Sequence, residues 1–92
     1  MLVSENLDEG QPLHDYFVGR YRRLRGSIAD ALRRGQAAGD IRADLDPGAL
    51  AARIVATLEG LETQWLLDPA EVDLQESFAE FAAALRSEVA PR

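Results

Sequence analysis

The sequence contains no cysteine and only one histidine, one methionine and one tryptophan among its 92 residues. Without cysteine, disulfide frameworks and thiolate metal sites are excluded. No apolar run approaches the roughly 20 residues that span a bilayer, and residues 1–5 lack the basic flank and apolar stretch of a signal peptide. We therefore expect a cytoplasmic protein that has no membrane partner and no cofactor.

Catalytic chemistry has little to be built from in this sequence. His14 is the single imidazole, and a lone histidine near a helix start is typical of a surface or capping residue. Two pairs of carboxylates stand one helical turn apart and suit solvated helix faces better than acid–base chemistry; they are Glu59 with Glu62 and Glu76 with Glu80. No glycine-rich loop matches a phosphate cradle. We expect neither a catalytic site nor a metal site, and hence no enzyme.

The size and charge of the chain suit one small globular domain, residues 1–92. A net charge of −6 argues against binding of nucleic acid by this chain alone, since phosphates repel an acidic surface. Arginines nevertheless cluster in the first half of the sequence, at Arg20, Arg22, Arg23, Arg25, Arg33 and Arg34. They could contact phosphate or a further domain. We favour a solvated helix face that pairs with acids elsewhere in the fold or in a dimer, because no base-stacking aromatics are interleaved with them.

Spacing and capping signals predict three helices, at about 13–38, 47–67 and 73–89, after a flexible segment 1–12. Apolar residues at spacings of three, four and seven form one face of the first helix. Gly39 can close that helix, and Asp46 followed by Pro47 suits the start of the second. Asp73 and Glu76 have the spacing of a capping box at the start of the third. Gly35, near the end of the first helix, indicates either close packing or a fraying end. The chain is predicted to be all-α.

The second and third helices carry more apolar surface than three helices can cover. The second is apolar over a wider arc than the roughly 100-degree stripe that a helix at the edge of a monomer needs. The third has an apolar 4-3-4 stripe that continues to Glu88, with alanines over much of the remainder. The further burial partner must therefore come from outside the chain, and the partner we expect is a second copy in a homodimer.

The segment from Gly39 to Pro69 resembles the C-terminal part of TetR-family (tetracycline-repressor-like) transcriptional regulators. The similar pieces are the connector from Gly39 to Pro47, Gly60-Leu61 in the middle of a helix, and the exit from Gln64 to Pro69. With His14, Tyr16-Phe17, Arg20-Tyr21 and Arg25 upstream, the resemblance extends from about Pro12 onward. It implies an antiparallel three-helix domain whose last two helices pair across a two-fold axis as a four-helix bundle. Family members read DNA with an N-terminal head, and residues 1–11 show no pattern for one.

The resemblance also implies site residues. The dimer interface is expected among Ile54, Leu58, Leu61, Trp65, Phe78, Phe81 and Leu85, some of which must instead face the core of their own chain. Thr57, Glu62 and Gln64 are candidate contacts for a small-molecule inducer of the full-length protein. The function expected is that of a regulatory, dimer-forming domain whose DNA contacts are made only through the head. The alternative is a free-standing helical module that binds a partner or forms mixed dimers with an intact regulator.

Overall fold

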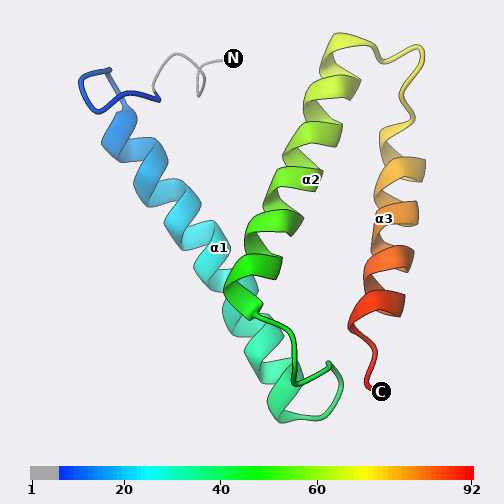
Figure 1. Ribbon diagram of the computed structural model, residues 1–92. Coiled ribbons are helices and arrows are strands. Elements are labelled where there is room, and N and C mark those ends of the chain that lie inside the picture. The colour runs from blue at the N-terminus through cyan, green and yellow to red at the C-terminus, as the bar shows by residue number, and fades with distance from the viewer. Residues whose placement is uncertain (1–6) are drawn as a thin grey trace.

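The computed structural model describes residues 7–92, which form three α-helices (Figure 1). They are α1 (His14–Ala37), α2 (Pro47–Leu67) and α3 (Leu74–Val89). No strand occurs within the described range, and the predicted all-α class is confirmed. The first six residues of the predicted flexible segment lie outside that range.

Aspartates begin two of the three helices. The Asp46 carboxylate accepts hydrogen bonds from the backbone N–H groups of Gly48 (3.0 Å) and Ala49 (3.3 Å), ahead of Pro47. The Asp73 carboxylate accepts one from the N–H of Glu76 at 2.9 Å. These bonds satisfy amides that a helix start otherwise leaves unpaired. The start of α1 has no side-chain cap, and its N-cap residue Leu13 has a φ of 69°.

The end of α1 is a close-packed turn rather than a frayed one. Gly39, with a φ of 82°, takes the left-handed conformation that closes many helices. The N–H of Asp40 donates to the carbonyl of Gly35 at 2.8 Å. A Cβ on Gly35 would stand 2.5 Å from Cδ1 of Ile41, so the returning chain needs a glycine there. Close packing is therefore the reason for this glycine.

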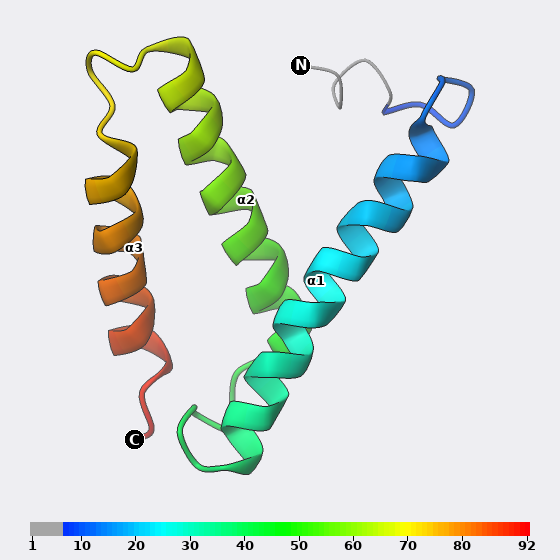
Figure 2. The same cartoon turned by 180° about the vertical axis from the view of Figure 1, so that it is seen from behind.

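The three helices form a single layer shaped like an open V (Figures 1 and 2). The C-terminal half of α1 packs on the N-terminal part of α2, and the two helices then diverge toward the other end of the molecule. Helix α3 returns beside α2. The molecule measures 43 × 35 × 14 Å, and its least dimension is close to the 10–12 Å diameter of one helix with its side chains.

A small core lies where the arms of the V join. Leu32, Leu50 and Ile54 are its buried members, and partly buried side chains surround them. Among residues 7–92, the buried hydrophobic residues all come from α1 and α2; they are Ala29, Leu32, Leu50, Ala51, Ile54 and Val55. None of the residues of α3 is buried. The radius of gyration is 15.5 Å, whereas a compact domain of this length has about 12 Å.

Polar groups fasten the α1–α2 loop to both of its neighbours. The side-chain amide of Gln36 donates to the carbonyls of Arg42 and Leu45, each at 3.0 Å. The backbone N–H of Arg42 donates to the carbonyl of Val89 at 2.9 Å, at the end of α3. The loop thereby joins the last turns of α1 and α3, and the opposite end of α3 is held by its connection to α2.

Candidate functional site

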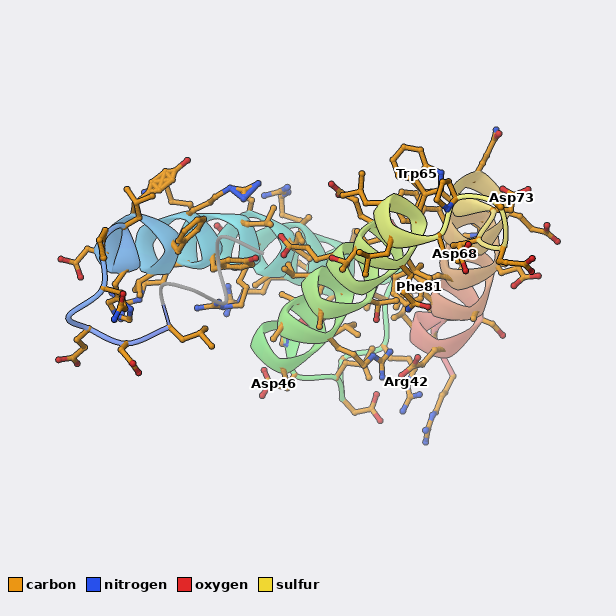
Figure 3. All side chains as sticks on the ribbon, turned by 90° about the horizontal axis from the view of Figure 1, so that it is seen from above. Arg42, Asp46, Trp65, Asp68, Asp73 and Phe81 are labelled. Carbon is orange, nitrogen blue, oxygen red and sulfur yellow. The ribbon has the colours of Figure 1, made fainter. Side chains whose placement is uncertain are left out.

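The apolar stripe of α3 is only half covered by the rest of the chain. It carries five large apolar side chains, all partly buried; they are Leu74, Phe78, Phe81, Leu85 and Val89. The last three pack against the core, and Phe81 lies between α2 and α3 (Figure 3). A helix whose stripe stays partly in water retains apolar surface that a further partner could bury.

The seven residues expected at a dimer interface differ in how exposed they are within one chain. Ile54 is only 8% exposed and belongs to the chain's own core. Leu58, Phe81 and Leu85 pack against that core and remain partly exposed. Leu61 and Phe78 are half-buried without belonging to the core cluster, and Trp65 is 38% exposed.

The most open part of this surface lies where α2 passes into α3. Trp65 projects from the helix layer at the end of α2 (Figure 3). It lines an open hollow with the α2–α3 connection and the first turns of α3, where Val72, Leu74 and Phe78 contribute apolar walls. Leu66 and Leu67 follow Trp65 and are 65% and 81% exposed. The end of α2 therefore concentrates exposed apolar side chains.

The three residues expected to contact an inducer do not form one site. The hydroxyl of Thr57 donates to the carbonyl of Arg53 at 2.9 Å, one turn back on α2. Glu62 and Gln64 are exposed, and neither lines the hollow beside Trp65. Glu62 follows Thr57 by five residues, or about 140° around the helix, so these two face different directions. Their role in ligand binding stays a prediction.

A hydrogen bond between α1 and α2 was not foreseen in the sequence. The hydroxyl of Tyr21 donates to the carboxylate of Glu59, across the V. This bond, together with desolvation and the negative charge of Glu59, raises the pKa of Tyr21 above its usual 10.0. The only signal for it was the position of Tyr21 beside the apolar stripe of its helix. A contact between residues 38 apart cannot be located from spacing alone.

Two ion pairs lie where the α1–α2 loop and the start of α2 meet the end of α3. Arg42 donates to both carboxylate oxygens of Asp44, at 2.9 and 2.7 Å, and to the carbonyl of Glu88 at 3.3 Å. Arg53 on α2 pairs with Glu88 on α3 at 2.5 Å. The guanidinium groups lower the pKa of Asp44 and of Glu88 below their usual values. The available signal was the position of Glu88 at the end of the predicted stripe of α3, although the structure leaves its side chain exposed and continues the stripe at Val89.

No helix within residues 7–92 combines the length and apolarity needed to cross a membrane. The same residues contain no group of three histidine, aspartate or glutamate side chains placed to hold a metal ion.

The fold is therefore a single layer of three helices with a partly exposed apolar stripe on α3. Residues 10–90 match the protein family described as the C-terminal domain of BetI-type transcriptional repressors. The match covers most of the chain, which therefore belongs to this family. The resemblance to the C-terminal part of TetR-family regulators is confirmed, and the class is regulatory rather than enzymatic. No curated protein and no solved structure matches the chain.

Proposed function

We propose that this chain is the dimer-forming regulatory domain of a transcriptional repressor, which joins two copies through the outer faces of α2 and α3. DNA is contacted through residues outside the matched range 10–90. The observation that carries the proposal is the half-covered stripe of α3, which bears five large apolar side chains and has no buried residue.

The exposed area of the chain supports a partner of substantial size. Its accessible surface is 6469 Å², whereas a compact monomer of 10.1 kDa exposes about 5,300 Å². A standard interface buries about 800 Å² on each partner, which is less than this difference. A second copy with the same stripe offers a matching surface, as closed two-fold dimers require.

The proposed interface centres on Leu61, Trp65 and Phe78, which the chain's own core does not use. The remaining expected members, Leu58, Phe81 and Leu85, contribute their outer edges to it, and Ile54 supports it from the core. The hollow between Trp65 and Phe78 gives a partner side chain a place to insert, and buried aromatic anchors of this kind supply much of the energy of an interface.

The test compares two substitutions on opposite sides of α2. Trp65→Ala removes the central aromatic and should weaken dimerisation by about 2 kcal/mol, measured by sedimentation velocity. Leu67→Ala is the matched control: this side chain is 81% exposed and lies about 200° further around the helix. We expect little change for Leu67→Ala. If it weakened the dimer and Trp65→Ala did not, the partner would be on the other face.

In the full-length repressor, an inducer would act on this dimer by changing the separation of its two copies. Thr57, Glu62 and Gln64 remain the proposed contacts. Titration of a binding ligand against Thr57→Val, Glu62→Gln and Gln64→Ala tests each one separately. Unchanged affinity in all three variants would remove these residues from the proposal.

A further inference from the structure

The chain carries two clusters of like charge, one basic and one acidic. The first, here called the basic limb, is the N-terminal half of α1 with Arg20, Arg22, Arg23 and Arg25. The second, here called the acidic end, surrounds the α2–α3 connection. No basic residue occurs between Arg53 and Arg86, and that stretch holds seven acidic ones. Five of these seven form the acidic end, namely Glu62, Asp68, Glu71, Glu76 and Glu80.

Within residues 7–92, no ion pair joins either cluster to a residue of its own chain. The ion pairs of residues 7–92 use Arg33, Arg42 and Arg53, all of which lie outside the basic limb. Their acidic members likewise lie outside the acidic end. Unpaired charges of one sign repel one another, and charge of the opposite sign on a partner relieves that repulsion.

Exposed apolar side chains accompany both clusters. Leu13 and Tyr16 on the basic limb are 51% and 53% exposed, and they line a shallow groove with Phe17 and Arg20. Trp65 and Leu66 stand beside the acidic end. Each cluster thus combines contact area with charge, as protein-binding surfaces do.

The two clusters lie at the same end of the molecule but on different arms of the V (Figures 1 and 2). The helices are ordered α1, α2, α3 across the layer. A two-fold axis parallel to α2 that stacks two such layers face to face reverses this order in the second layer. Helix α1 of one copy then lies on the same side of the dimer as α3 of the other, which is the partner helix nearest to it, with the basic limb and the acidic end at the same height.

We propose that the basic limb is a docking surface for the acidic end of a second copy, so that each dimer contains two such contacts. This inference rests on the proposed function, since it adds a charged contact to the dimer formed by α2 and α3. It also fixes the direction of the two-fold axis, because an axis perpendicular to α2 would place the basic limb and the acidic end at opposite ends.

Nucleic acid is the competing occupant of the basic limb. The whole chain has a net charge of −6, and the acidic end lies at the same end of the molecule as the basic limb. A phosphate backbone that approached the limb would meet this negative field, whereas the acidic end of a second copy is attracted by the limb itself.

The test reverses charges on each surface separately. One variant combines Arg20→Glu with Arg23→Glu, and the other combines Glu71→Arg with Glu80→Arg; all four side chains are exposed and none is in an ion pair. The control combines Arg33→Glu with Arg34→Glu, which makes the same change in charge at the other end of α1. Dissociation constants of the full chain are measured by sedimentation velocity at low salt, with circular dichroism as a check on helix content.

Each limb or end variant alone should dimerise about tenfold more weakly than the wild type, because both contacts become repulsive. An equimolar mixture of the two should form a mixed dimer of wild-type affinity, because both of its contacts are again between opposite charges. The control should stay near the wild type. The milder pair Arg20→Gln and Arg23→Gln should reduce the salt dependence of dimerisation, which keeps the proposal testable if a reversed variant unfolds.

Several results would overturn the inference while leaving the proposed function intact. These are an unchanged dissociation constant in the limb variant, a mixture that does not recover affinity, and duplex DNA binding that depends on Arg20 and Arg23 in a dimer of unchanged strength. A wild-type chain that stays monomeric would instead contradict the proposed function itself.

Discussion

Gly35 illustrates how a single residue without a side chain shapes the end of α1. A Cβ there would meet Cδ1 of Ile41 at 2.5 Å and Cγ1 at 2.9 Å, and Ile41 packs against the core. Alanine gains about 1 kcal/mol in helix propensity, but overpacking at such a site costs about 1–3 kcal/mol. Gly35→Ala should therefore lower the free energy of unfolding by about 1 kcal/mol, as measured by urea denaturation.

Gly26 gives the matched control on the same helix. No atom lies within 4 Å of the position that its Cβ would occupy. Gly26→Ala should raise the free energy of unfolding by about 0.5–1 kcal/mol. If both substitutions stabilised the protein, the close approach of Ile41 would not be a constraint in solution.

Asp46 contributes as a cap at the start of α2. Its carboxylate accepts from two backbone N–H groups, and Asp46→Ala leaves both without a protein partner. We expect a loss of about 1 kcal/mol in the free energy of unfolding. Asp40→Ala is the control, because it removes an exposed carboxylate that makes no such bond. It should change the free energy of unfolding by less than about 0.5 kcal/mol. Equal effects of the two would mean that net charge, not capping, is responsible.

At the scale of elements, the bond from Tyr21 to Glu59 joins the arms of the V in the part where they diverge. Tyr21→Phe should lower the free energy of unfolding by about 1 kcal/mol at neutral pH. Tyr16→Phe is the control, because Tyr16 is 53% exposed and its ring packs edge-on against that of Phe17. The pKa of Tyr21 is raised in the folded protein, so its contribution is complete below pH 10.0 and is lost as the pH rises through the folded value. The assignment would be contradicted if the wild type and Tyr21→Phe differed in free energy of unfolding by the same amount at neutral and at strongly alkaline pH.

The attachment of α3 to α2 should respond to acid. Arg53 lowers the pKa of Glu88 below its usual 4.5, so the contribution of Glu88 is complete above that pH and is lost as the pH falls through the folded value. The free energy of unfolding of the wild type should decline between neutral and acidic pH, and Glu88→Gln should make this decline less steep. Asp40→Asn, at an exposed position outside both charge clusters and without an ion pair, should leave this decline in the free energy of unfolding unchanged. If the free energy of unfolding fell equally with pH in the wild type and in Glu88→Gln, the ion pair between Arg53 and Glu88 would not hold α3.

Helix positions were predictable because they depend on nearby residues. Asp46 with Pro47 and Asp73 act locally, and α2 and α3 begin where these residues predict. The divergence of α1 from α2, the burial of Ile54 and the bond from Tyr21 to Glu59 were not predictable. Each depends on which side of a helix a distant segment occupies, and an apolar stripe does not tell whether its own chain or a second copy covers it.

The whole molecule is one layer of helices, 14 Å thick, and this shape explains why α3 has no buried residue. Two layers are the usual minimum for an enclosed core. The second copy in the proposed dimer would supply the missing layer.

The mass of the wild-type chain in solution tests this claim most directly. Sedimentation equilibrium at micromolar concentration should give a species of twice the 10.1 kDa chain mass. A single species of 10.1 kDa with intact helix content would contradict the account, because the stripe of α3 would then remain open to water in a stable protein.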